Sequence, residues 1–317
     1  MLKYLLSRVG QAVVVIFVVT LIVFFLLHQI PGGPARGALG LYATPEQIAA
    51  FNQAQGFDRS LPEQYGRFLL RLLQGDLGDS FTLNQSVGDL IAQRLPKTLV
   101  LTVLYVLVAL AIAVPLGMWQ APRRGRVADY VTTGVTFVLY STPAFFLAFV
   151  LIIVFSQTIP LFPAQAPQSD TLAGIFAEPG ALVLPVATGA AATVAVFSRY
   201  MRSSVLDNLS EDYVRTARAK GASERQVLRQ HVLRNSLTSV VAMLGYYIPR
   251  VFAGAIVIES MFNYPGMGLL FWNAAQTRDY PILLGVVLVI AIATVAGSLL
   301  ADVVQALIDP RTRKARV

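Results

Sequence analysis

The sequence predicts an all-α polytopic membrane protein with six transmembrane helices and a long extracytoplasmic insertion after the first. Hydrophobic residues make up 56% of the 317 residues and charged residues only 13%, whereas soluble domains are roughly one-quarter charged. Crossing a hydrocarbon core of about 30 Å takes about 20 helical residues at about 1.5 Å each. Six apolar blocks meet this length or approach it, at residues 9–30, 97–119, 130–159, 181–197, 237–258 and 282–307.

The blocks differ in what they predict. The first is expected to be an uncleaved anchor, because its apolar run exceeds the roughly 7–15 residues of a signal peptide and no A-x-A-like site follows it. The third is long enough to tilt, or to end in a turn before Pro160. The fourth is short and rich in small residues, which is typical of a helix packed closely against others.

Basic residues are concentrated in alternate loops. The amino terminus, the loop with Arg123, the segment 198–236 (the basic segment) and the carboxyl tail together hold 17 of the 25 lysines and arginines. The segment 31–96 (the first loop segment) has five arginines against six acids, and the other two intervening loops hold Arg278 alone. Cytoplasmic loops are enriched in Lys and Arg, so both termini and the basic segment are expected in the cytoplasm. The net charge of +8 then requires no nucleic-acid partner.

The first loop segment is expected to be ordered. Thr44 followed by Pro45 is typical of an N-cap with proline at the first helical position, and predicts a helix near 46–55. Residues 62–73 have the apolar periodicity of an amphipathic helix, and Q-G-D-L-G-D at 74–79 then breaks the chain. We expect a small cap on the outer mouth of the spans.

Motifs for catalysis and nucleotide binding are absent from the sequence. No glycine is followed by lysine, which excludes a Walker-type phosphate loop, and neither H-E-x-x-H nor G-x-S-x-G occurs. There is no cysteine, and the two histidines, His28 and His231, are far apart. The sequence therefore predicts neither an enzyme nor a metal site in this chain.

The basic segment is the most informative stretch. Helical periodicity places Tyr213 and Ala217 on apolar faces, Lys220-Gly221 is a helix-ending signal, and Ser223 opens a second helix. Two short helices joined at a glycine would form a rigid projection on which a partner protein can push. A basic helix attracted to anionic membrane lipid, at about 1 kcal/mol per base, explains the same composition. The residues alone do not decide between these interpretations.

Short motifs in a fixed order run along nearly the whole chain. They are D-Y-V-R-T-A-R-A-K-G at 212–221, P-G-G-P at 31–34, R-L-P-K-T-L at 94–99, S-T-P-A-F-F at 141–146, E-S-M-F-N-Y-P-G-M-G at 259–268 and D-P-R at 309–311. Each motif is weak evidence alone. Together, and in their order along the chain, they resemble the motifs of the dipeptide and oligopeptide permeases of ATP-binding cassette (ABC) importers. The long first loop segment resembles that of the first, B-type, permease subunit of such systems.

The chain departs from the family pattern at several places. Arg215-Thr216-Ala217 stands where the general importer loop has E-A-A, as in the peptide branch, and Gly33 replaces an acid. Thr238-Ser239 replaces a frequent proline, and L-F-P-A-Q at 161–165 is a degraded L-P-A-x-G. These changes leave the class intact and weaken any transfer of substrate range.

The resemblance implies the type I ABC importer transmembrane fold, with one permease domain over 1–317 in the prokaryotic inner membrane. Its implied partners are a second homologous permease subunit, two cytoplasmic ATPase subunits or one fused ATPase, an extracytoplasmic substrate-binding protein, and membrane lipid. ATP and magnesium would be bound by the ATPase, with no cofactor in this chain. The residues implied at the ATPase contact are Asp212, Tyr213, Ala217, Arg218, Lys220, Gly221 and Ala222.

Arg250 lies near the middle of the fifth block, about 13 Å along a helix from Glu259. A charge there costs at least about 2.5 kcal/mol unless it faces a cavity or a partner. We therefore expect Arg250 to line the translocation pathway and to meet a peptide carboxylate. Ser141 and Glu259 are expected to line the same pathway. The alternatives are pairing with another span or subunit without a ligand role, and a span shifted outward.

Other functions remain to be weighed. A secondary transporter or channel accounts for the spans only, and its ion sites would require intramembrane acids, whereas the charges expected inside the spans are Arg250 and the terminal Asp302. A membrane enzyme lacks its catalytic residues. Within the importer class, similar permeases carry nickel chelates and other small solutes as well as peptides.

Overall fold

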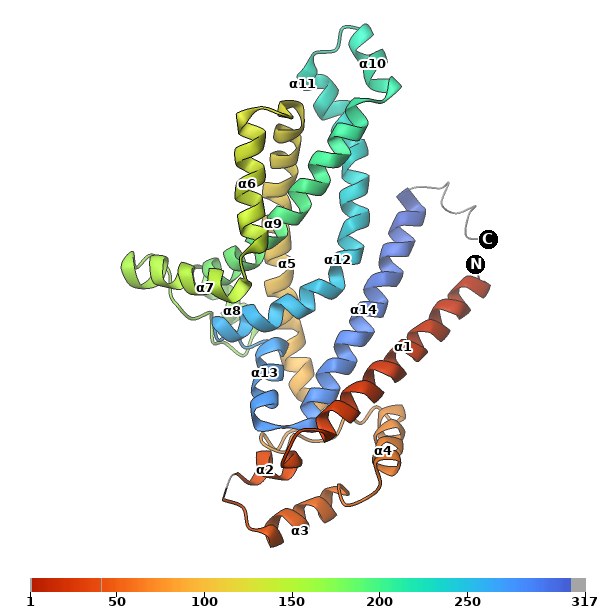
Figure 1. Ribbon diagram of the computed structural model, residues 1–317, viewed down its shortest axis with the longest axis vertical. Helices are drawn as coiled ribbons and strands as arrows, with labels where there is room; N and C mark the ends of the chain where they lie inside the picture. Colours follow the sequence, from red (N-terminus) through yellow and green to blue (C-terminus); the bar gives the residue numbers. More distant parts are fainter. Residues whose placement is uncertain (1, 41, 309–317) are drawn as a thin grey trace. The chain divides into compact units, whose positions relative to one another are not determined.

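The computed structural model describes residues 2–40 and 42–308, except the side chains of 2–7, 9, 246, 248–254 and 301–308. Within these ranges the chain is helical and has no β-strand beyond one isolated bridge between Asp79 and Ser86. The α-helices (Figure 1) are α1 (Leu2–His28), α2 (Gly33–Leu39), α3 (Pro45–Gln55), α4 (Leu61–Leu73), α5 (Val87–Gln120), α6 (Val127–Ser141), α7 (Ala144–Ile152), α8 (Leu172–Ala177), α9 (Pro179–Leu209), α10 (Asp212–Ala219), α11 (Glu224–Gln226), α12 (Leu233–Met261), α13 (Met267–Thr277) and α14 (Tyr280–Ile308). The prediction of an all-α fold is confirmed.

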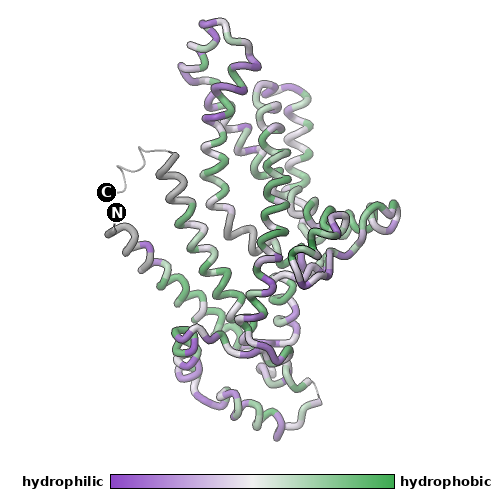
Figure 2. The backbone as a smooth tube through the Cα atoms, turned by 180° about the vertical axis from the view of Figure 1, so that it is seen from behind, coloured by the Kyte–Doolittle hydropathy of each residue, from purple (hydrophilic) through white to green (hydrophobic). Residues whose placement is uncertain are grey.

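Among the described residues, four stretches are each long and apolar enough to cross a membrane: Gly10–His28, Val87–Arg123, Pro179–Leu209 and Tyr280–Leu300. They correspond to the predicted blocks 9–30, 97–119, 181–197 and 282–307. Figure 2 shows these helices in the colours of hydrophobic residues and α10 in those of hydrophilic ones. The predicted block 237–258 lies within α12, where some side chains fall outside the described part of the structure.

The third predicted span, 130–159, is wrong as a single helix. Its residues form α6 and α7, which are bent by 100° at Thr142 and Pro143. Proline disfavours the helical conformation of the residue before it, and Thr142 accordingly has φ −76° and ψ 124°. The helical run also ends at Thr158, before Pro160 as predicted. The bend at Thr142 and Pro143 comes in addition, and the two helices together remain a candidate span.

Two predicted helix boundaries also need correction. Helix α5 begins at Val87 and continues through Pro96. The sequence instead predicted that the first loop segment ends at residue 96 and that the helix begins at 97. Burial of Val87, Leu90 and Ile91 in a hydrophobic cluster offsets the cost of an internal proline, which is about 3 kcal/mol. Helix α9 continues to Leu209, so the first twelve residues of the basic segment extend a span helix.

The chain divides into two compact units. The first comprises Met1–Thr98 and Pro265–Ala296, and the second comprises Leu99–Tyr264 and Gly297–Val317. In the first unit, the Tyr280 hydroxyl donates to the carbonyl of Leu27 at 2.5 Å, and the Tyr65 hydroxyl donates to the carbonyl of Phe17 at 3.2 Å. Helices α4 and α14 are thus each anchored on α1 by a tyrosine side chain.

The first loop segment folds as its local signals predict. Thr44 caps α3 in a reciprocal capping box with Gln47, with Pro45 at the first helical position. Helix α4 buries Tyr65 and Phe68 on one face, which matches the predicted amphipathic helix. A loop with left-handed glycines at Gly75 and Gly78 then leads to α5.

The second unit contains two hydrophobic clusters. One joins α5, α9 and the end of α12 around Tyr105, Leu184 and Phe262. The other joins α9, α10 and the start of α12, and its fully buried members include Phe197, Met201, Val205, Val214, Val227 and Val232. This second cluster supports the candidate functional site.

Candidate functional site

The turn after α10 is held in one conformation by its backbone. Lys220 ends the helix, and Gly221 follows at φ 84°, in the left-handed region. The amide of Ala222 donates to the carbonyl of Ala217 at 3.1 Å, and that of Gly221 to the carbonyl of Arg218 at 2.9 Å. These two bonds are those of a Schellman motif, which glycine completes at least cost. The predicted helix end at Lys220-Gly221 is confirmed.

The next helix begins with a capping box. The side chain of Ser223 accepts from the amide of Gln226 at 3.4 Å, and the amide of Ser223 donates to the side chain of Gln226 at 2.9 Å. The helix does not end there, because a π-helical stretch, Val227–Val232, follows α11 and leads directly into α12. The second short helix of the prediction is therefore the first part of a longer helical run (Figure 1).

A bidentate ion pair spans the turn. The Arg218 guanidinium donates to the Glu224 carboxylate, Nε to Oε1 at 2.8 Å and Nη2 to Oε2 at 3.1 Å. This hydrogen bonding raises the pKa of Arg218 above its usual value. Both side chains are substantially exposed, so the pair adds little stability, but it bridges α10 and α11 across the turn.

Helix α10 has an inner and an outer face. Val214 and Ala217 are buried in the cluster with Val227 and Val232. The Tyr213 hydroxyl donates to the side chain of Asn208 at 2.6 Å, which ties α10 to the end of α9. The outer face exposes Asp212, Arg215, Thr216, Arg218, Ala219, Lys220 and Gly221.

The structure thus separates the predicted contact residues into two groups. Asp212, Arg218, Lys220 and Gly221 face outward, where a partner protein has access to them. Ala217 is buried, and Tyr213 and Ala222 are half-buried. The burial of Ala217 favours a packing role within the chain.

A polar cluster beneath this site was not predicted. Buried Asp129 accepts from the Arg202 guanidinium, Nε to Oδ1 at 2.9 Å and Nη2 to Oδ2 at 2.8 Å. It also accepts from Gln120 Nε2 at 2.9 Å and from the amide of Gly125 at 3.0 Å. The cluster joins the start of α6 to α9 and orders the loop between α5 and α6. In the sequence, Asp129 follows a run of arginines. This stretch was interpreted only as a basic loop.

The structure describes the side chains of two of the three residues predicted for the pathway, Ser141 and Glu259. Ser141 is exposed at the end of α6, next to the bend. Glu259 is fully buried in α12. The side chain of Arg250 lies outside the described part of the structure. The pathway role of all three stays a prediction.

Sequence comparison defines the class of protein to which this helical chain belongs. Residues 113–314 match the family described as the binding-protein-dependent transport system inner membrane component, and residues 1–102 match the N-terminal model of such membrane components. The chain belongs to this family.

Individual relatives agree with this assignment. The chain is 38% identical over 322 residues to a putative peptide permease protein of Brucella ovis, with 99% of each chain covered. It is 34% identical to the oligopeptide transport system permease protein AppB of Bacillus subtilis, with 98% of this chain and 99% of the relative covered. An amino acid ABC transporter crystal structure shares the fold, with a TM-score of 0.51 at 17% identity over 69% of this chain and 94% of that one.

Membership fixes several properties. The chain is a multi-pass inner-membrane permease subunit of an ABC importer and carries no ATPase site of its own. It works with an ATPase and a substrate-binding protein, as its binding-protein-dependent class requires. A secondary transporter or a channel is therefore excluded as its class.

Proposed function

We propose that this chain imports di- or oligopeptides as one of two homologous permease subunits, with both termini in the cytoplasm. The peptide specificity is supported by the names of full-length relatives, a putative peptide permease and an oligopeptide permease. The orientation is supported by the concentration of basic residues in the basic segment and at both ends of the chain.

The basic segment is proposed to be the coupling element. The single observation that supports this most is the α10 turn, which combines a buried inner face, a fixed glycine bend and an exposed outer face. A projection of this kind transmits force, because it cannot move without moving α9 and α12. Its exposed residues Asp212, Lys220 and Gly221 are assigned to a groove on the ATPase.

In this scheme ATP and magnesium bind to two ATPase subunits, or to one fused ATPase, and not to this chain. Closure of the ATPase would draw together the α10 projections of the two permease subunits. The spans would then pass from an inward-open to an outward-open arrangement, with a substrate-binding protein delivering the peptide outside. Anionic lipid beside the basic loops remains a compatible further contact.

The test is uptake by the reconstituted importer. Vesicles containing this chain, its sibling permease and the ATPase are loaded with ATP and given the binding protein and a labelled tripeptide. The proposal predicts uptake that requires ATP and ceases when the ATPase is inactivated. Uptake that is independent of ATP, or ATP-driven uptake of a nickel chelate with none of any peptide, would contradict it.

A further inference from the structure

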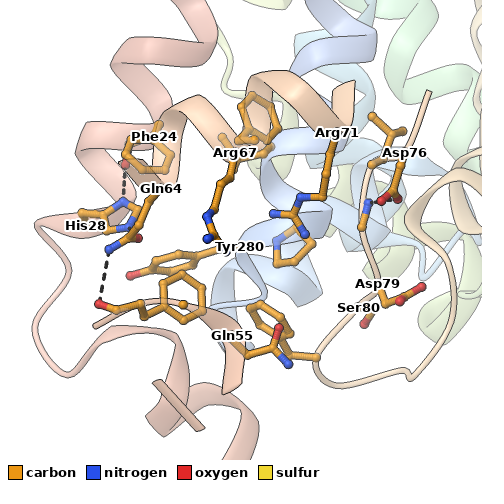
Figure 3. A pocket seen from close by; sticks show the side chains of 18 of the residues that line it. Phe24, His28, Gln55, Gln64, Arg67, Arg71, Asp76, Asp79, Ser80 and Tyr280 are labelled. Carbon is orange, nitrogen blue, oxygen red and sulfur yellow. Dashed lines mark hydrogen bonds between the residues drawn. The ribbon is translucent and has the colours of Figure 1, made fainter. Parts of the chain in front are cut away.

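The first unit contains a pocket that the importer class does not account for. It has a volume of about 560 Å³ and is lined by α1, α3, α4, residues 76–84 and the first residues of α14 (Figure 3). This volume lies within the roughly 300–1,000 Å³ of small-molecule sites. Every lining residue belongs to the same compact unit, so the pocket does not depend on how the two units are arranged.

One wall of the pocket is aromatic and rigid. The rings of Phe51, Phe57 and Phe81 contact one another with centroids 5.4–6.3 Å apart, and Tyr280 lies 6.1 Å from Phe57. His28 contributes to the same side, with its Nε2 hydrogen-bonded to Gln64 at 2.9 Å. A wall of this kind binds an apolar or aromatic group without first having to order itself.

The opposite wall carries positive charge. Arg67 and Arg71 come from successive turns of α4, and their side chains extend into the pocket (Figure 3). Within the described chain, no hydrogen bond or ion pair engages the Arg71 guanidinium. Arg67 makes only an exposed contact with Glu63 at 3.5 Å. Two guanidinium groups on one wall suit a carboxylate, which they bind in a fixed, bidentate geometry.

A negative charge completes the lining. Asp79 lies away from the two arginines in Figure 3, and among the described residues nothing donates to its carboxylate. Asp76, the other acid of the pocket, already accepts from the amide of Gly78 at 2.8 Å. The pocket thus presents cations and an anion that do not neutralise each other directly.

We propose that this pocket binds a short peptide as a zwitterion, which rests on the proposed function in peptide import. The peptide carboxylate pairs with Arg67 and Arg71, its apolar side chain packs on Phe57 and Phe81, and its ammonium group faces Asp79. An extended di- or tripeptide spans about 7–10 Å, which matches a pocket of this volume. The permease would then hold peptide at a site of its own, in addition to that of the binding protein.

The test measures peptide affinity in the complete importer, purified in lipid nanodiscs without its binding protein. The probes are the dipeptide Ala-Phe and its C-terminal amide, which lacks the carboxylate. The double variant Arg67→Gln/Arg71→Gln is expected to weaken Ala-Phe binding at least about tenfold, and the amide should bind the native protein equally weakly. The amide should lose little further affinity in the double variant, because its missing carboxylate is the group that the arginines bind.

The matched control is Arg59→Gln. Arg59 lies in the same loop segment and pairs with Glu63, but it does not line the pocket, so its loss should leave affinity unchanged. Equal affinity of the native protein and the double variant for Ala-Phe overturns the proposal. A double variant that binds the peptide normally but loses its substrate-binding protein also overturns it, in favour of a protein carboxylate as the occupant.

Uptake of Ala-Phe, measured with the same variants and the binding protein restored, separates the two proposals. If the native protein imports Ala-Phe and the double variant binds Ala-Phe as tightly as the native protein does, the proposed peptide site in the pocket is rejected. The proposed function in peptide import is then retained. A native protein that binds Ala-Phe at this pocket but imports no peptide rejects the function alone. If the native protein neither binds nor imports peptides, both proposals are rejected.

Discussion

The Arg202 guanidinium of α9 donates two parallel hydrogen bonds to the buried carboxylate of Asp129, Nε to Oδ1 at 2.9 Å and Nη2 to Oδ2 at 2.8 Å. The carboxylate has only 7% of its side-chain surface exposed. This contact joins the start of α6 to α9, the helix that leads to α10.

Replacing Asp129 should destabilise the protein. In Asp129→Asn the Arg202 charge loses its counter-charge in a half-buried site, at an expected cost of about 1.5–3 kcal/mol. The measurement is the thermal unfolding of the purified permease in detergent. Asp212→Asn is the control, since Asp212 is exposed and makes only a 3.4 Å contact with Arg215. Equal unfolding temperatures for the two variants would show that the pair is dispensable.

Substitutions at Gly221 should be limited by the backbone conformation of this residue and not by steric contacts of the new side chain. A side chain there would meet no atom within 4 Å, but the residue has φ 84°. Left-handed backbone costs most residues about 1–2 kcal/mol, and asparagine less than β-branched residues. Gly221→Val should insert normally and fail in peptide uptake, whereas Gly221→Asn should retain part of the uptake. Normal uptake by the valine variant would refute the coupling role of this turn.

Ala217 and Ala219 offer a matched pair on one helix. Ala217 is buried at 8% exposure and Ala219 is exposed. Ala217→Leu should overpack the cluster around Val214 at a cost of about 1–3 kcal/mol and shift α10, which would lower ATPase activity stimulated by the binding protein. Ala219→Leu should leave unfolding unchanged. The prediction fails if both variants unfold at the temperature of the native protein.

The Arg218–Glu224 pair should matter more for coupling than for stability. Because both groups are exposed, Glu224→Gln should change the free energy of unfolding by less than about 1 kcal/mol. It should nevertheless reduce the peptide transported per ATP hydrolysed, since the turn loses the side-chain contact that bridges α10 and α11. The exchange Arg218→Glu/Glu224→Arg should restore part of that ratio. An unchanged ratio in the single variant would limit the pair to a surface contact.

Helix caps were predicted correctly from the sequence, because the hydrogen bonds that form them are local. Thr44 with Pro45, the end of α10 at Lys220-Gly221, and Ser223 as an N-cap were all predicted from a few adjacent residues, and the structure has each of them. Capping depends on hydrogen bonds within about one turn, so no distant contact decides it.

Errors arose where packing overrides such signals. Pro96 was predicted to end a loop, but buried neighbours keep it inside α5. The third predicted span ends before Pro160 as expected, but it has a further break at Pro143 that was not predicted. The Asp129–Arg202 pair joins residues 73 positions apart, which no periodicity reveals. The pocket lining is similarly assembled from five separate segments of one unit, which no local pattern reveals.

The central claim is that the α10 turn transmits the work of an ATPase to the spans. Its most direct test compares native protein and Gly221→Val in vesicles containing the full importer, with labelled tripeptide uptake and ATP hydrolysis measured together. The account predicts ATP-dependent uptake by the native protein and a fall of at least about tenfold in the variant, equivalent to about 1.4 kcal/mol, with the ATPase still bound. Undiminished uptake by the variant would contradict it.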